Sequence, residues 1–296
     1  MKKIDSDKAL RLVIYAVLTL VCLTIIYPFW NLIVISLNTG TDTARGGIMM
    51  WPREFTWENY KLVFKDNRLV TAAKISVLKT VIGTGAQILF TSIFAYGISR
   101  RELKFKNFYM KYALITMYVS GGLIPSYILI RTLHLINTFW VYVVPAMFSA
   151  WNMVIFKSFF ENLPEGLLES AKIDGAGEYM TFFKIVVPIS GPVFASLILF
   201  TAVDQWNGWF EGAIYITNQK LIPLQTLLKQ IISANTAGQL MEQVSGTAAE
   251  KLAEETLTSK SLSTAAMFVT TIPIIMVYPF LQKYFVGGMM VGSIKE

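Results

Sequence analysis

The segment from Glu161 to Pro192 reads ENLPEGLLESAKIDGAGEYMTFFKIVVPISGP and lies between two long apolar runs. Its charged residues and helix-forming composition predict two short helices joined by a turn. Pro164 suits the first turn of a helix, where its missing N–H costs nothing. Gly175 lies where that helix must stop, at a position that favours a positive φ. Four residues between them form a short apolar stripe, with Glu165, Glu169 and Lys172 facing elsewhere: Leu167, Leu168, Ala171 and Ile173.

The composition excludes an ordinary soluble domain, because 54% of the residues are hydrophobic, 15% are charged and the mean hydropathy is +0.52. Apolar segments long enough to cross a hydrocarbon core of about 30 Å recur along the chain. We therefore predict an all-α integral membrane protein with six transmembrane helices in a single domain, residues 1–296. The predicted spans are residues 11–37, 70–98, 108–130, 138–160, 187–213 and 263–285. Prolines within them indicate bent helices: Pro28, Pro125, Pro145, Pro192, Pro273 and Pro279.

Basic residues gather at the ends of the predicted spans, which is the pattern of an inner-membrane protein rather than a nucleic-acid-binding surface. They precede the first span and form the loop RRELKFK, residues 100–106. We read the first span as uncleaved, since it is too long for a signal peptide and no cleavage site follows. With six spans, both termini and the loop 161–186 lie in the cytoplasm, and the loop 214–262 lies outside.

No nucleotide, metal or disulfide site is indicated in this chain. It lacks the G-x-x-x-x-G-K-[ST] phosphate loop, so it cannot itself be an ATPase. Its one cysteine, Cys22, lies in the first span, and its one histidine, His134, lies in a predicted outer loop. We expect no catalytic residue, no metal and no cofactor bound by the chain.

Two outer segments have distinct patterns. Residues 38–69 mix aromatic and charged residues, which suits a helix at the membrane interface. Residues 214–262 begin with helical apolar spacing and become polar. The second segment is either a docking site for an extracytoplasmic partner or a solvated connector.

The spacing E-S-A-x(3)-G-x(9)-I-x-V-P, beginning at Glu169, resembles the EAA loop of ATP-binding-cassette (ABC) importer permeases, from which it departs at Ser170 and Val187. The resemblance covers nearly the whole chain. Segments such as YVSGGLIPSYILIRTLHLINTFW, AVDQWNGWFEGAIYI and YFVGGMMVGSIKE are similar to carbohydrate permeases of the branch that carries complex oligosaccharides, including those from plant and algal polysaccharides. The chain looks like the subunit type related to the smaller maltose permease.

This resemblance implies the type I ABC importer permease fold and a bacterial inner-membrane subunit of a carbohydrate importer. The implied partners are a second homologous permease, a pair of ATPase subunits that bind ATP and Mg, an extracytoplasmic solute-binding protein, an oligosaccharide and the lipid bilayer. The implied mechanism is alternating access, with the loop moved by the ATPase. The residues it assigns to coupling are Glu169, Ser170, Ala171, Asp174, Gly175, Ile185 and Pro188, with Gly287, Gly288 and Gly292 in a C-terminal tail that reaches the ATPase.

Substrate residues are predicted in the outer half of the fifth span, where polar and aromatic side chains cluster: Asp204, Gln205, Trp206, Asn207 and Trp209. Two alternatives are that these tryptophans are interface anchors, as is common near the end of a span, and that the second permease holds the substrate site alone. Two rival functions are an ion-coupled secondary transporter with a proton on Asp204, and a non-transporting membrane scaffold or channel subunit. Neither explains the EAA-type spacing.

Overall fold

The computed structural model describes residues 2–244 and 260–276. These residues are mainly α-helical, and their only paired strand residues form one isolated bridge between Asn38 and Phe55. Contacts divide the chain into two units. The first unit comprises Met1–Asn67 with Leu228–Ile272, and the second comprises Arg68–Leu227 with Pro273–Glu296.

The first unit begins with α1 (Lys2–Ser36), which contains the predicted first span. The most apolar 18 residues within Leu10–Ser36 have a mean hydropathy of 2.4 and none of them is buried inside the chain, whereas Val34 and Ser36 at the end of the helix are buried. A helix that is apolar on all sides is stable only when lipid or another chain surrounds it. The length and composition of this helix therefore match a membrane span.

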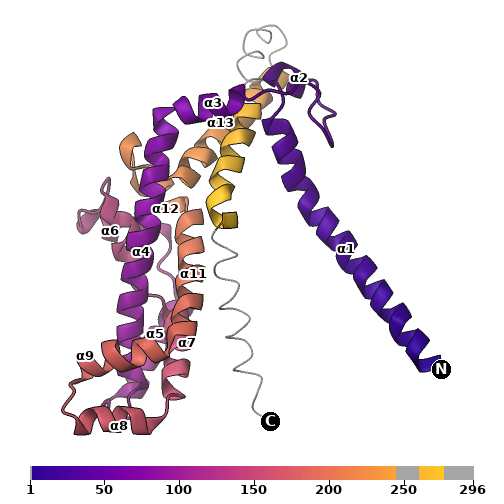
Figure 1. The fold of residues 1–296 in the computed structure, drawn as a ribbon. Helices are drawn as coiled ribbons and strands as arrows, with labels where there is room; N and C mark the ends of the chain where they lie inside the picture. Colours follow the sequence, from indigo (N-terminus) through magenta and orange to yellow (C-terminus); the bar gives the residue numbers. More distant parts are fainter. Residues whose placement is uncertain (1, 245–259, 277–296) are drawn as a thin grey trace. The chain divides into compact units, whose positions relative to one another are not determined.

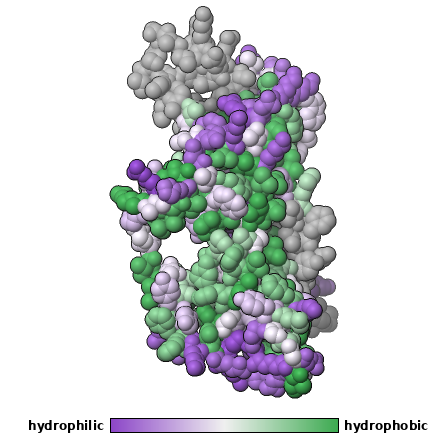
Figure 2. Space-filling model, turned by 90° about the vertical axis from the view of Figure 1, so that its left-hand side faces the viewer, coloured by the Kyte–Doolittle hydropathy of each residue, from purple (hydrophilic) through white to green (hydrophobic). Residues whose placement is uncertain are grey.

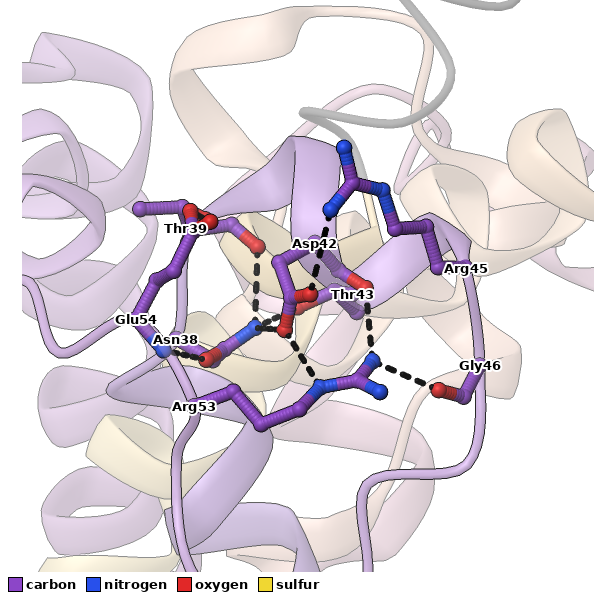
Figure 3. A network of polar contacts seen from close by, with 8 residues as sticks. All are labelled: Asn38, Thr39, Asp42, Thr43, Arg45, Gly46, Arg53 and Glu54. Atoms are coloured by element: carbon purple, nitrogen blue, oxygen red, sulfur yellow. Dashed lines mark hydrogen bonds and ion pairs between the residues drawn. The ribbon is translucent and has the colours of Figure 1, made fainter.

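A buried carboxylate organises the segment that follows α1 (Figure 3). Asp42, in α2 (Gly40–Ala44), accepts hydrogen bonds from Asn38 Nδ2 at 3.0 Å and Arg53 Nε at 2.9 Å. The amide of Asn38 and the guanidinium of Arg53 hold the pKa of Asp42 below its usual value. Asn38 Oδ1 also accepts from the backbone N–H of Glu54 at 2.8 Å. The segment is thus a folded loop closed by polar contacts.

Residues 38–69, which suit an interfacial helix by sequence, form two separate short helices, α2 and α3 (Glu58–Lys65), rather than one continuous helix. Gly46 and Gly47 both have a φ of +73°, which no continuous helix accommodates. A helix over Lys260–Met276 completes the described part of this unit, and Ser261 Oγ bonds Asn59 Oδ1 at 3.2 Å. This helix covers the first half of the predicted span 263–285, and the rest of that span lies outside the described residues.

The second unit is built around α4 (Asn67–Ser99), α7 (Ala150–Glu161) and α11 (Gly191–Asn207). The predicted span 70–98 is present as the continuous helix α4. The hydrophobic core of this second unit contains buried side chains from α4, α5, α7, α11 and the segment leading into α11: Ile88, Ala95, Tyr96, Ile98, Ala113, Met153, Phe156, Phe160, Phe182, Val186, Val193 and Leu197.

The predicted span 108–130 is broken into two helices rather than formed by one. The chain forms α5 (Lys106–Tyr118) and α6 (Leu123–Thr132), which meet at 117°. Gly122 between them has a φ of +80°, a conformation that interrupts a right-handed helix. With 13 residues, α5 is about 20 Å long, too short to cross a membrane unaided.

The predicted spans 138–160 and 187–213 are also interrupted. Short 3₁₀ turns, η1 (Phe139–Tyr142) and η2 (Val144–Ala146), precede α7 and meet it at 46°, with Pro145 in the second turn. The helical segment Glu178–Ile189 meets the helix that follows it at 84° across Ser190. Residues 187–189 therefore belong to the helical segment before the bend and not to α11. Pro188 and Pro192, on either side of the bend, lack the N–H that a continuous helix needs.

Candidate functional site

The first helix of the predicted coupling segment, residues 161–188, is α8 (Glu165–Ile173), which lies with α9 (Glu178–Thr181) at the lower end of Figure 1. It ends in a Schellman turn. The N–H of Gly175 bonds the carbonyl of Lys172 at 3.0 Å, and the N–H of Ala176 bonds the carbonyl of Ala171 at 2.9 Å. Gly175 has a φ of +77°, which confirms the predicted turn and explains the glycine.

The predicted coupling residues divide into one buried anchor and an outward-facing set. Ala171 is buried at 4% exposure, so the helix contacts the unit through a small side chain. Glu169, Ser170 and Asp174 are exposed, and the Ser170 hydroxyl donates to the carbonyl of Gly166 at 2.7 Å. After the π-helical segment η3 (Phe182–Val186) come α10 (Val187–Ile189) and the bend. Ile185 is half-buried and Pro188 is exposed, whereas Gly287, Gly288 and Gly292 lie outside the described residues.

Two ion pairs hold α8 to the loop that follows α4. Arg101 Nη1 lies 2.8 Å from Glu165 Oε1 at the start of α8. Lys172 Nζ lies 2.7 Å from Glu102 Oε1 near its end. The hydrogen bond and charge of Lys172 hold the pKa of Glu102 below its usual value. Each exposed pair contributes little stability alone, but together they fix both ends of the helix against one loop.

A third contact joins α9 to α4 itself. The Tyr96 hydroxyl lies 2.6 Å from Glu178 Oε2, and Arg100 Nε lies 3.6 Å from the same oxygen. The Arg100 guanidinium also lies over the Tyr96 ring, 5.5 Å from its centroid. Tyr96 is 6% exposed and belongs to the hydrophobic core of the second unit, so this contact connects the coupling segment to that core through α4.

A cavity of ≈ 450 Å³ separates α8 from the α4–α5 loop, and its wall is mostly charged. Glu169 lines it, together with Arg100, Arg101, Lys106, Glu161 and Lys172. Hydrophilic residues gather at this end of the molecule, below a region rich in hydrophobic residues (Figure 2). This end can therefore receive a charged protein surface.

The predicted substrate residues lie where α11 ends. Asp204, Asn207 and Trp209 are exposed, and Trp206 is half-buried. Gln205 differs, because it is 6% exposed and its Cδ would lie only 3.0 Å from a Cβ added to Gly83 in α4. Its side chain packs against α4, so it faces the core rather than an open path.

The comparisons with known proteins agree over almost the entire chain. Residues 7–291 match the family described as "Binding-protein-dependent transport system inner membrane component". The chain belongs to this family. This permease is 35% identical over 292 residues to the polygalacturonan/rhamnogalacturonan transport system permease protein YtcP of Bacillus subtilis (strain 168), covering 98% of this chain and 99% of YtcP.

Two further relatives bear on the fold and function. Protein LplC of the same organism is 35% identical over 270 residues, 91% of this chain and 89% of LplC. A crystal structure of a bacterial ABC transporter involved in the import of the acidic polysaccharide alginate superposes with a TM-score of 0.84 at 25% identity. That match covers 95% of this chain and 98% of the other. The type I ABC permease fold is thereby confirmed, although its helices are not six uninterrupted ones.

Sequence reasoning missed two groups of residues in this permease. The loop 100–106 was read only as a sign of orientation, and no spacing rule pairs its charges with Glu165, Lys172 and Glu178 far along the chain. The sequence-based prediction also missed Lys79, a residue of α4 that is only 2% exposed. An ionisable residue inside an apolar span is a signal that would have singled it out.

Proposed function

We propose that this permease is the membrane-spanning subunit of an ATP-driven importer for an oligosaccharide, and that it couples ATP hydrolysis to transport through residues 161–188. The observation that carries the proposal is α8 with its Schellman turn at Gly175, fixed to the loop that follows α4 by two ion pairs and built on the EAA-type spacing. An ion-coupled transporter or a scaffold needs no such hairpin. ATP and Mg bind to a separate ATPase pair, and a second permease completes the path.

Exposed apolar side chains on the coupling segment support an ATPase contact. Ile173 is 87% exposed and Tyr179 77%, and Leu167 and Met180 are also exposed. Apolar residues grouped on an otherwise hydrophilic end mark a protein interaction site. Glu169 lies on the same helix as Ile173, so a partner that covers these residues also meets a carboxylate that a basic group can pair with.

The relatives narrow the substrate class. YtcP is named for polygalacturonan and rhamnogalacturonan, and the structural relative for alginate. We propose that this permease carries an oligosaccharide derived from an acidic plant or algal polysaccharide, delivered by an extracytoplasmic solute-binding protein. The test is uptake by the reconstituted complex of a panel containing oligogalacturonides, alginate oligosaccharides and raffinose. ATP-dependent uptake of an acidic saccharide supports the assignment, and uptake of raffinose alone contradicts it.

The orientation gives a first prediction. We propose that both termini and the coupling segment are cytoplasmic, as the basic loop 100–106 indicates. On a Cys22→Ser background, a cysteine replacing Lys104 or Glu165 should be shielded from an impermeant maleimide in intact cells. A cysteine replacing Gln239, in α13 (Leu224–Val244), should react readily. Efficient labelling at position 165 before lysis is the result that overturns the orientation.

The substrate cluster gives a second prediction. If Trp206 stacks on a sugar ring, Trp206→Ala should lower transport through a loss of about 1–3 kcal/mol in binding, which is roughly five- to 150-fold. The assembled complex should form in normal amounts. An interface anchor predicts the reverse, poorer insertion with an unchanged apparent KM in the complex that does assemble. Uptake kinetics normalised to assembled complex separate the two, and Trp209→Ala is measured in parallel.

A further inference from the structure

Lys79 places a positive charge in the interior of the second unit. Its ammonium donates to the carbonyl oxygen of Gly208 at 2.8 Å and lies 3.6 Å from Glu211 Oε2. It also lies 5.2 Å from the centroid of the Tyr142 ring. A buried cation in an apolar span is tolerated when a carboxylate, a carbonyl and an aromatic face surround it in this way.

The ammonium occupies the point where the fifth span is interrupted. α11 ends at Asn207 and α12 (Phe210–Tyr215) begins three residues later. The carbonyl of Gly208 is turned toward Lys79, and a Cβ on Gly208 would lie only 2.7 Å from the Lys79 Nζ. Glycine is therefore what permits this approach. The negative end of the α11 dipole further favours a cation here.

Glu211 joins this buried charge to an open cavity. Its side chain is 40% exposed, whereas that of Lys79 is only 3% exposed. The carboxylate lines a cavity of ≈ 270 Å³ shared by α6, the 3₁₀ turns and α12, together with Ser126, Phe210 and Tyr215. The Tyr215 ring stacks on Tyr127, with centroids 5.9 Å apart and planes at 23°. The carboxylate of Glu211 therefore both pairs with Lys79 and lines the cavity.

We propose that Glu211 is a substrate-binding residue of this permease and that Lys79 is the positioning residue that holds its carboxylate at the cavity wall. This inference rests on the proposed function. The ligand is a hydroxyl-rich carbohydrate, whose hydroxyl groups donate to the carboxylate oxygens. Apolar and aromatic walls with one oriented polar group are typical of small-molecule sites. Because Lys79 compensates the charge of Glu211, the site also accepts an acidic saccharide without net repulsion.

The decisive variant replaces both partners, Lys79→Met with Glu211→Met. Replacing a buried ion pair by apolar side chains of similar size is often neutral for stability, so the complex should assemble. Each single methionine variant leaves one charge uncompensated and should assemble less well. With the panel saccharide that the wild-type complex takes up best, the double variant should show an apparent KM about tenfold higher or more, with little change in maximal rate per complex.

A wild-type apparent KM in the double variant would show that the pair is only structural and would overturn the inference. Glu211→Gln keeps the size and one acceptor oxygen of the side chain, so it covers the case in which the double variant does not assemble. It should raise the apparent KM less than the double variant does, and an unchanged KM again overturns the inference. If the wild-type complex itself takes up none of the panel saccharides, the proposed function fails instead, and the two failures are distinguishable.

Discussion

Replacing Glu169 by lysine is expected to detach the ATPase from this permease while leaving the permease inserted in the membrane. Glu169 is exposed on α8 and lines the charged cavity beside Arg100 and Arg101. Its reversal places a like charge against the basic group that we propose it meets. A like charge buried in a protein interface costs several kcal/mol, which is roughly a thousandfold or more in affinity. The readout is the ATPase that co-elutes with the tagged permease.

Ser170→Ala is the matched control for Glu169→Lys. Ser170 is the exposed neighbour of Glu169, its hydroxyl donates to the carbonyl of Gly166 in the same helix, and alanine is the residue of the EAA pattern. This variant should retain the ATPase and coupled transport. Normal co-elution and normal substrate-stimulated hydrolysis in Glu169→Lys would remove Glu169 from the coupling contact.

Gly212→Val is expected to prevent most of the permease from assembling, because α12 packs directly against Pro223 and the start of α13. A Cβ on Gly212 would lie 2.4 Å from Thr226 Oγ1 and 2.9 Å from Pro223 Cδ. The Thr226 hydroxyl donates to the carbonyl of Trp209 at 2.8 Å, so a side chain at position 212 also displaces this bond. Overpacking of this kind costs about 3 kcal/mol, roughly a 150-fold change in the ratio of folded to unfolded permease.

The control for this prediction is Gly191→Ala in α11, where a Cβ meets no atom within 4 Å. Assembled complex is measured by size-exclusion chromatography in detergent, and its half-life at a fixed elevated temperature reports stability. Gly191→Ala should behave as the wild type does. Equal yields and half-lives for Gly212→Val and Gly191→Ala would show that α12 does not pack as described.

Hydropathy predicted the helices that are apolar along their whole length. It did not predict where a span is broken, because the backbone conformation at a few residues determines the break. α4 lies close to its predicted bounds, and α1 ends close to its predicted end but begins at Lys2, nine residues before the predicted start of the first span. The break at Gly122 depends on a positive φ, and hydropathy does not register dihedral angles. Prolines indicated that some spans are bent but not which ones. Pro28 lies inside the unbroken helix α1, whereas Pro188 and Pro192 flank a bend of 84°. The surrounding contacts, rather than proline alone, decide the outcome.

The candidate site was predictable as far as local chemistry defines it. The turn at Gly175 follows from a local rule about helix ends, and it is present with both hydrogen bonds of a Schellman turn. The contacts of Glu178 with Tyr96 and of Lys79 with Gly208 join residues 82 and 129 positions apart. Such pairs depend on how helices pack, which no spacing within one segment specifies. The coupling helix was therefore predictable, and its attachment to α4 was not.

We propose that α8 is the surface that the ATPase contacts, and cross-linking between the two proteins tests this contact most directly. On a Cys22→Ser background, a cysteine replaces Ile173, which is 87% exposed on α8, or Tyr118, which is 86% exposed at the end of α5. The complex purified with its ATPase is treated with a short bis-maleimide. We predict a permease–ATPase adduct from position 173 and none from position 118. Equal amounts of adduct from both positions, or none from position 173 in a complex that retains its ATPase, would show that α8 is not the surface that the ATPase contacts.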